Sequence, residues 1–259
     1  MRFTVLASGS KGNTTLIETQ GGKYLIDAGL SAKKTVQLLT QNQITIEQIQ
    51  GIFVTHEHGD HVAGIRVLCD RYGVPIYIHE QTFVALKENH RPKTQERVFF
   101  IDAGEHEIGP FKVEAFPLSH DVAFMLGYTF TAQNKKVVYV TDSGYVNQNL
   151  DGKLANADAY IFETNHDPEM VRMSGYPFSV QQRILSDVGH LSNEDSARTL
   201  ARLIGPRTKH VILAHLSQEN NTPDLAMLTV ERIFEQLGIQ NHLKLLVAKQ
   251  EQSLPTLQL

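Results

Sequence analysis

The sequence lacks most of the features that mark secreted or membrane-bound proteins. A single cysteine, Cys69, excludes an internal disulfide and fits a reducing compartment. The opening segment, MRFTVLASGS, has no apolar core of the kind found in signal peptides. No stretch approaches the roughly 20 apolar residues that span a bilayer. We therefore expect a cytoplasmic protein that does not associate with a membrane.

An excess of positive charge is also missing. The formal net charge is −4 and the pI is about 6.3, so the chain has no general attraction for polyanions. Any contact with nucleic acid must come from a local patch. Hydrophobic residues make up 41% of the chain and charged residues 20%, which is typical of a globular protein and excludes disordered or fibrous classes.

No Pro/Ser-rich linker, low-complexity run or close repeat divides the 259 residues. Short apolar or alternating runs predict strands over residues 3–6, 14–18, 24–27, 51–56, 74–79, 111–117, 125–131, 136–141, 159–164 and 210–216. Helices are predicted over 31–39, 61–72 and 82–89, after an N-cap at Ser192, and from Thr222 to Gly238. This pattern predicts an α/β fold of packed sheets with helices outside, forming a single domain over residues 1–259.

The strongest chemical signal is the segment THEHGDH, which follows an apolar strand. It holds four residues of metal-ligand type, His56, His58, Asp60 and His61, within six positions. Imidazole nitrogens and carboxylate oxygens suit Zn²⁺, Mn²⁺ or Fe. On an extended segment His56 and His58 point the same way, because side chains alternate. Asp60 and His61 follow where the chain turns into a helix, so they can face a second ion.

Three further candidates occur where an apolar strand ends. His120 follows KVEAFPLS, Asp142 follows KVVYVT, and His215 ends HVILAH. A histidine at the end of one strand is usually structural. Several such strand ends in one chain indicate instead that sheets deliver ligands from distant positions to a common edge.

The chain resembles members of the metallo-β-lactamase superfamily over nearly its whole length. Asp27 in LIDAG, the HEHGDH segment, His120, Asp142 and His215 match the five motifs in order. The resemblance implies a metallo-β-lactamase-type αββα four-layer sandwich that binds two divalent metal ions, with Zn or Mn expected and Fe possible. It implies that one metal is bound by His56, His58 and His120, and the other by Asp60, His61 and His215. Asp142 would bridge the two, and Asp27 would orient ligands from behind.

Two details narrow the subfamily. Common metallo-β-lactamases carry Arg in place of His61 and use a Cys ligand, whereas Cys69 lies on a helix and is expected in the core. The segment GHLSNED, which contains His190, resembles the H-S-T segment of tRNA 3′-processing endonucleases. There a histidine outside the metal ligands assists phosphodiester cleavage. Thiolester hydrolases resembling glyoxalase II share the metal motifs and remain an alternative.

The combination most resembles the WalJ/YycJ-like (VicX) bacterial proteins. The matching segments are LASGSKGN, LIDAGLS, THEHGDH, ETNHD, GHLSNED and LAHLSQENN. That family is regarded as cytoplasmic nucleases resembling 5′-to-3′ DNA exonucleases, often encoded beside a two-component signalling system. The resemblance therefore implies a nucleic-acid substrate, DNA rather than RNA, and a possible functional link to such a system.

The implied mechanism is metal-dependent phosphodiester hydrolysis. Two ions would lower the pKa of a water between them to give hydroxide at neutral pH. His190, just before a helix N-terminus, would act as general acid on the leaving 3′ oxygen, so His190 and Asp60 are the predicted catalytic residues. Alternatives are a small-molecule ester, thiolester or lactone hydrolase, and a non-catalytic regulator of the signalling system.

Several residues have weaker predicted roles. Glu163 and His166, near the end of a strand, are expected behind the metal ligands or in a capping loop. Tyr176 and Arg183 are candidate substrate contacts. Related sequences tend to carry Lys where this chain reads PFSVQQ, so Arg183 or Lys11 would have to hold the phosphate. The remaining histidines, which lack a motif, are expected to be structural or on the surface: His79, His90, His106, His210 and His242. The stripe Leu225, Leu228, Ile233, Phe234, Leu237 is expected in the core.

Overall fold

The computed structural model describes residues 1–239 and 243–259, so His242 lies outside the described residues. The chain forms two compact units. Unit 1 comprises Met1–Pro117, Val122–Leu126 and Lys249–Gln258, and unit 2 comprises Leu118–Asp121, Gly127–Ala248 and Leu259. The prediction of one domain over residues 1–259 stays a prediction. None of the helices in the described part of the chain combines the length and hydrophobicity that crossing a bilayer requires.

Unit 1 is built on a mixed sheet in the order β14-β1-β2-β3-β4-β5-β6. Its strands are β1 (Arg2–Ala7), β2 (Thr14–Thr19), β3 (Gly22–Ile26), β4 (Ile49–Phe53), β5 (Ile76–Ile78), β6 (Val98–Phe100) and β14 (Leu257–Gln258). Strands β3 to β6 run parallel, whereas β1, β2 and β14 pair antiparallel. A hairpin, β7 (Gly104–Ile108) and β8 (Phe111–Pro117), belongs to the same unit. The last segment of the chain thus supplies an edge strand beside the first.

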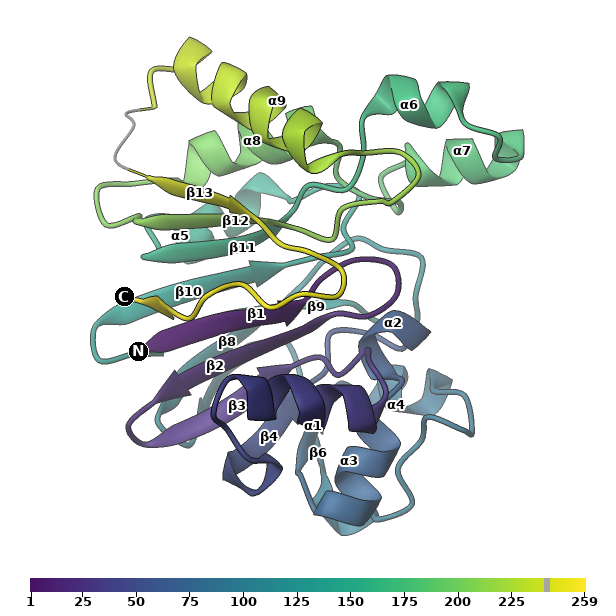
Figure 1. Ribbon diagram of the computed structural model, residues 1–259, viewed down its shortest axis with the longest axis vertical. Coiled ribbons are helices and arrows are strands. Elements are labelled where there is room, and N and C mark those ends of the chain that lie inside the picture. The colour runs from purple at the N-terminus through teal and green to yellow at the C-terminus, as the bar shows by residue number, and fades with distance from the viewer. Residues whose placement is uncertain (240–242) are drawn as a thin grey trace. The chain divides into compact units, whose positions relative to one another are not determined.

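The helices of unit 1 are α1 (Ala32–Gln41), α2 (Gly59–Val62), α3 (Ile65–Tyr72) and α4 (Glu80–Ala85). Figure 1 shows α1 and α3 side by side on one face of the sheet. Leu38 and Leu39 of α1 and Leu68 and Cys69 of α3 are buried in one cluster with apolar side chains of the sheet. The prediction that Cys69 is a core residue is therefore confirmed.

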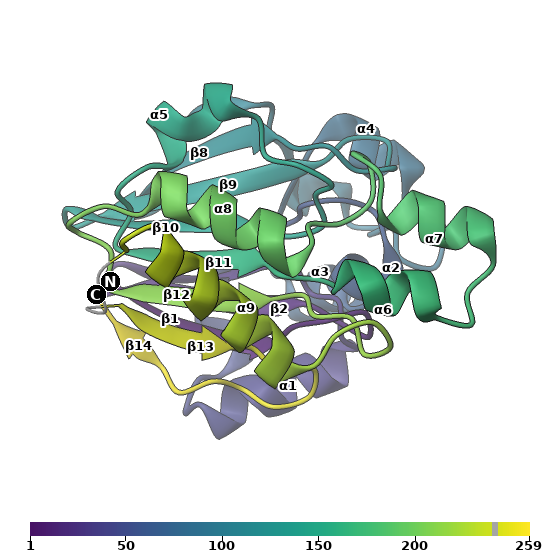
Figure 2. The same ribbon diagram turned by 90° about the horizontal axis from the view of Figure 1, so that it is seen from above.

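Unit 2 contains β9 (Leu126–Ala132), β10 (Lys135–Val140), β11 (Ala159–Glu163), β12 (His210–Ala214) and β13 (Lys244–Val247). The last four run parallel, and β9 pairs antiparallel with β10. Its helices are α5 (Asp151–Leu154), α6 (Pro168–Met173), α7 (Phe178–Ile184), α8 (Asn193–Leu203) and α9 (Pro223–Gln236). Figure 2 shows α8 and α9 lying together along one face of the sheet. Two mixed sheets with helices confirm the α/β class.

Two predictions about elements need correction, and two helices were missed. The helix expected over residues 61–72 is two helices, because Gly64 donates its N–H to the carbonyl of Ala28 and a Cβ there would meet the carbonyl oxygen of Leu30 at 2.5 Å. The helices α6 and α7 were not predicted. In the stripe expected to be core, Leu228 is 63% exposed and Leu237 is 51% exposed, so these two side chains lie on the outer side of α9.

Candidate metal centre

In unit 1 the candidate residues lie just beyond the carboxyl ends of the parallel strands β3 and β4, the sheet edge at which α/β proteins bind ligands. Asp27 follows β3, and Thr55 and His56 follow β4. Asp27 has a φ of 58°, the left-handed conformation that Asp tolerates better than most residues. This turn lets the Asp27 side chain contact the segment that follows β4.

Asp27 is fully buried and accepts hydrogen bonds from two residues. The Thr55 backbone N–H donates to Oδ1 at 2.9 Å, and the Thr55 hydroxyl lies 3.0 Å from Oδ2. Nδ1 of His61 lies 2.7 Å from Oδ2. Burial raises the pKa of Asp27, while His61 and Thr55 act in the opposite direction. With Nδ1 of His61 donating to Asp27, Nε2 is the ring nitrogen left to bind a metal.

The other candidates of unit 1 surround His61. Its ring centroid lies 4.2 Å from that of His56, which lies 4.8 Å from that of His58. Oδ2 of Asp60 lies 3.4 Å from Nε2 of His61. The four ligand-type residues of the THEHGDH segment therefore gather in one cluster.

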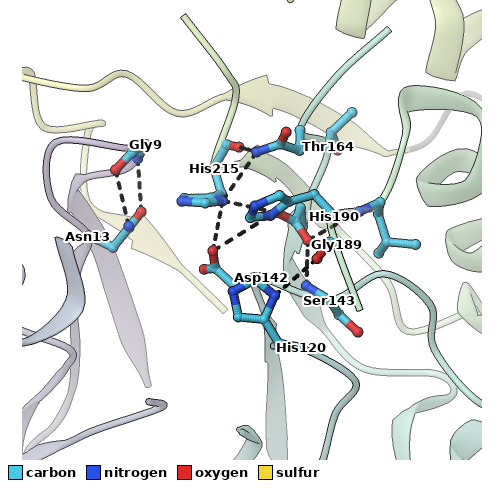
Figure 3. A network of polar contacts seen from close by, with 12 residues as sticks. Gly9, Asn13, His120, Asp142, Ser143, Thr164, Gly189, His190 and His215 are labelled. Carbon is cyan, nitrogen blue, oxygen red and sulfur yellow. Dashed lines mark hydrogen bonds and ion pairs between the residues drawn. The ribbon is translucent and has the colours of Figure 1, made fainter. Parts of the chain in front are cut away.

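Asn13 is a residue of this cluster that the sequence analysis missed. Its side-chain Nδ2 lies 3.0 Å from Nε2 of His61, and its backbone N–H donates to the carbonyl of Asp60 at 2.8 Å. Asn13 also exchanges two hydrogen bonds with Gly9 (Figure 3). A Cβ on Gly29 would meet that same Asp60 carbonyl at 1.5 Å, so glycine is required there. The signal in the sequence was the segment LASGSKGN, which matches the WalJ/YycJ-like group but gave Asn13 no role of its own.

In unit 2 two candidates again follow parallel strands. Asp142 comes after β10 and His215 after β12, with φ values of 54° and 55°. Oδ1 of Asp142 lies 3.3 Å from Nδ1 of His215 and 3.7 Å from Nδ1 of His190. Figure 3 shows the three side chains converging on one point. In each unit, residues with left-handed backbone conformation at strand ends thus turn ligand-type side chains toward one edge of that unit's own sheet.

Glu163 is the centre of this second group. It ends β11 between the two neighbouring strands and is fully buried. Oε1 lies 2.8 Å from Nδ1 of His190 and 3.0 Å from Nδ1 of His215. Oε2 accepts the backbone N–H groups of Ser143 at 2.7 Å and Leu191 at 3.4 Å. Burial alone would raise the pKa of Glu163, but the two histidines outweigh it and lower this pKa to about 2.

His190 lies in the loop before α8, and its side chain is 18% exposed. Its backbone N–H donates to the carbonyl of Ile184 at 3.2 Å. Ser192, two residues on, caps α8 by accepting from the N–H of Asp195 at 3.1 Å, as predicted. Since Nδ1 of His190 donates to Glu163, Nε2 is the nitrogen available for chemistry.

His120 also contacts this loop. Its Nδ1 donates to the carbonyl of Gly189 at 3.0 Å, and its ring centroid lies 5.1 Å from that of His190. The next residue, Asp121, binds the guanidinium of Arg183 through both carboxylate oxygens. Hydrogen bonding to Asp121 raises the pKa of Arg183. Arg183 therefore connects α7 to the segment that carries His120.

The remaining predicted residues lie outside these two groups or at their margins. His166 is buried, and burial lowers its pKa to about 4, so it stays neutral at pH 7. Tyr176 lies in the connection between α6 and α7, away from the contacts described above. Lys11 is exposed, and its backbone N–H donates to Gln250 at 2.9 Å. The structure gives neither Tyr176 nor Lys11 a contact with a candidate ligand.

The residues of each unit fit a divalent metal ion. Two ligand atoms about 2.0–2.1 Å from a tetrahedral Zn²⁺ lie roughly 3.3 Å apart. In unit 1 the separation of 3.4 Å between Oδ2 of Asp60 and Nε2 of His61 meets this requirement. In unit 2 the predicted ligands Asp142 and His215 lie side by side, with Oδ1 of Asp142 3.3 Å from Nδ1 of His215. Imidazole and carboxylate donors suit Zn²⁺, Mn²⁺ and Fe.

Comparison with known proteins agrees with this donor set. A family model described as the beta-lactamase superfamily domain matches residues 23–216. This chain belongs to the metallo-β-lactamase superfamily. This chain is 43% identical to Exodeoxyribonuclease YycJ of Bacillus anthracis, over 92% of this chain and 90% of that protein. It is 40% identical to Exodeoxyribonuclease WalJ of Streptococcus pneumoniae, over 88% of this chain and 86% of that protein.

A solved structure supports the fold of this superfamily member. The metallo-beta-lactamase fold protein YhfI from Bacillus subtilis matches with a TM-score of 0.69 and 19% sequence identity, over 98% of this chain and 99% of that chain. At that identity the likeness concerns the fold alone. The predicted metallo-β-lactamase-type fold and the resemblance to the WalJ/YycJ-like group are both confirmed.

Proposed function

We propose that this protein is a metal-dependent exonuclease that degrades DNA in the 5′-to-3′ direction. Two relatives at 40–43% identity are both named exodeoxyribonucleases, which supports the substrate class. The observation that carries the proposal is the pairing of His190 with Glu163. His190 lies outside the seven predicted ligands, yet a buried carboxylate holds it and part of its ring reaches solvent.

Two ions, Zn or Mn, would be held by the ligands predicted from the superfamily motifs: His56, His58, Asp60, His61, His120, Asp142 and His215. When bound, they would supply a nucleophile from water at neutral pH and offset phosphoryl charge. Asp27 and Glu163 would fix the imidazoles of His61 and His215 through Nδ1. A cytoplasmic location and a link to a two-component signalling system remain predictions from the resemblance.

His190 would act on the leaving group. Because Glu163 accepts a hydrogen bond from Nδ1–H, Nε2 of His190 would pass its proton to the departing 3′ oxygen. The products would then end in 5′-phosphate and 3′-hydroxyl. His166 would not share this role, because its low pKa keeps it neutral.

The test compares His190→Ala with His215→Ala. His190→Ala should keep its metal and its fold but cleave single-stranded DNA about 10²- to 10⁴-fold more slowly, which is the usual contribution of a positioned proton donor. The loss should shrink on a diester whose nitrophenolate leaving group departs without a proton. His215→Ala should lose metal together with activity. Metal analysis, end-labelled DNA and RNA, and a thiolester panel provide the readouts.

Three results would contradict this proposal. Loss of metal from His190→Ala would make His190 a ligand and exchange the roles of the two histidines. Cleavage of DNA by His190→Ala at the normal rate, with chemistry rate-limiting, would leave the loop a structural role only. Products that end in 3′-phosphate would reverse the proposed direction of attack.

A further inference from the structure

A cavity of about 470 Å³ lies in unit 2 along one side of α8. His190 and Ser192 line it near the N-terminus of the helix, and Arg198 and Arg202 line it along the following turns. Arg172 of α6 faces the same cavity. Its volume falls in the range of about 300–1,000 Å³ that small-molecule sites occupy. None of the proposed metal ligands lines it, so it is a separate feature that adjoins His190.

The charged side chains around this cavity differ in whether they already have partners. Arg202 pairs with Asp151, Nε to Oδ2 at 2.7 Å, and Arg172 pairs with Glu169. Arg198 is exposed and makes no ion pair within residues 1–239 and 243–259. Arg198 therefore presents to the cavity a guanidinium group that has no ion-pair partner in the described part of the chain.

Two aspartates also line the cavity, and neither forms an ion pair with Arg198 in the part of the chain that the structure describes. Asp195 accepts from the hydroxyl of Ser192 at 2.6 Å, as part of the cap of α8. Asp187 lies in the loop before His190, and its backbone packs closely against Gly144. The N-terminal end of α8, an 11-residue helix, adds positive potential at the end where His190 lies, and Glu194 and Asp195 in its first turn offset part of it. The cavity thus suits an anion that enters beside His190.

We propose that this cavity binds a phosphate of the substrate strand on the leaving-group side of the scissile bond, with Arg198 as its main ligand. The proposal rests on the proposed nuclease function. His190 would protonate the departing 3′ oxygen, so the nucleotide that leaves must lie on the side of His190. Guanidinium groups bind phosphate oxygens through two parallel hydrogen bonds, which an unpaired Arg198 is able to form.

Such a site would supply the local attraction that a chain of net charge −4 otherwise lacks. The phosphate could be the 5′-terminal monophosphate or an internal phosphodiester, since both present the same oxygens. The two sources can be told apart, because an oligonucleotide without its 5′-terminal phosphate still offers internal phosphodiesters but no terminal one.

The experiment uses the full-length, Mn²⁺-loaded protein and compares Arg198→Glu with Lys209→Glu. Lys209 is exposed and precedes β12, at the opposite end of that strand from His215, so both variants change the charge of unit 2 equally. We measure kcat/KM on a single-stranded oligonucleotide with a 5′-phosphate, on the same oligonucleotide with a 5′-hydroxyl, and on bis(p-nitrophenyl) phosphate. The chromogenic diester has no second phosphate to occupy the cavity.

For Arg198→Glu the ratio of DNA to chromogenic-diester kcat/KM should fall about tenfold or more, as expected for a lost charge-assisted contact. The slope of log KM for DNA against log salt should decrease by about one. A loss confined to the 5′-phosphorylated oligonucleotide assigns the cavity to the terminal phosphate. An equal loss on both oligonucleotides assigns it to an internal one, and either result supports the site.

The inference is overturned if Arg198→Glu matches Lys209→Glu in both the activity ratio and the salt slope. Failure of the proposed function would look different, because the wild-type protein itself would then not cleave DNA. Thermal unfolding of both variants checks that each is folded under the assay conditions.

Discussion

Asp27 in unit 1 and Glu163 in unit 2 are both fully buried carboxylates that accept a hydrogen bond from Nδ1 of a histidine. Their ionisation shifts in opposite directions, because burial raises the pKa of Asp27 while that of Glu163 is lowered to about 2. Asp27 is held by one imidazole and by Thr55. Glu163 accepts from two imidazoles and from two backbone N–H groups.

Burial is the largest single influence on the pKa of both carboxylates, and the second histidine beside Glu163 is the difference that favours its ionised form. Two histidines beside Glu163 overcome the cost of removing its charge from water. In unit 1 the single histidine beside Asp27, together with Thr55, does not overcome this cost. The more strongly ionised carboxylate therefore lies beside His190, the residue proposed to move a proton, whereas the imidazole that contacts Asp27 belongs to the proposed metal ligand His61.

The largest effect is expected for Glu163→Gln, which tests whether Glu163 acts through His190 and not only through metal binding. Every contact of Glu163 comes from a donor, whereas glutamine has only one acceptor oxygen, so one donor group must face the amide NH₂. We expect kcat on DNA to fall about 10²- to 10⁴-fold, as for loss of the proton donor. Added metal should not restore it. Full recovery with excess Mn²⁺ would show that Glu163 acts only through metal binding.

Asp27→Asn should have a smaller effect of a different kind. The amide would donate where Asp27 now accepts from Nδ1 of His61, which favours the tautomer with hydrogen on Nε2 and removes that nitrogen from metal binding. We expect metal affinity to fall about 10- to 100-fold, with activity restored at high metal concentration. Metal titration followed by activity provides the measurement. An activity loss that no metal concentration reverses would remove the distinction between the two carboxylates.

Asp158 provides a control carboxylate in unit 2 without any histidine. It is buried and contacts Lys135 at 2.8 Å and Arg207 at 2.7 Å. Burial alone would raise the pKa of Asp158, but these hydrogen bonds and one from the N–H of Lys136 lower it. A lowered folded pKa means stabilisation that is present above the unfolded pKa and is lost as pH falls through the folded value.

Asp158→Asn should therefore lower the free energy of unfolding by about 1–3 kcal/mol at pH 7. The difference from wild type should disappear progressively below about pH 3.9, the ordinary pKa of Asp. Activity on DNA should not change beyond what unfolding explains. Denaturant titrations between pH 3 and 7 measure this. A stability difference that stays constant with pH would show that Asp158 contributes through packing instead.

Much of the fold was readable because the parallel strands are continuous apolar runs. The strand over residues 159–163 is buried at every position, and the β12 segment HVILA is nearly so. The sequence also predicted the N-cap at Ser192, which requires only local hydrogen bonding. Ligand-type residues were found because they follow such runs directly.

What was missed depends on contacts between segments distant in sequence. The break between α2 and α3 arises because the backbone at Gly64 packs against the segment after β3, which no helical periodicity records. The helices α6 and α7 span 6 and 7 residues, too short for a periodic signal. Asn13 and the double role of Glu163 likewise become visible only once strands have brought them beside His61 and His190.

The pairing of β1 with β14 closes an edge of the sheet in unit 1. The carbonyl of Val5 in β1 accepts from the N–H of Leu254, and Phe3 is in register with Leu257. An uncovered strand edge presents N–H and C=O groups that can pair with a strand of another molecule. Strand β14 occupies that position beside β1, so removing residues 254–258 should expose β1 and increase the tendency of the protein to self-associate.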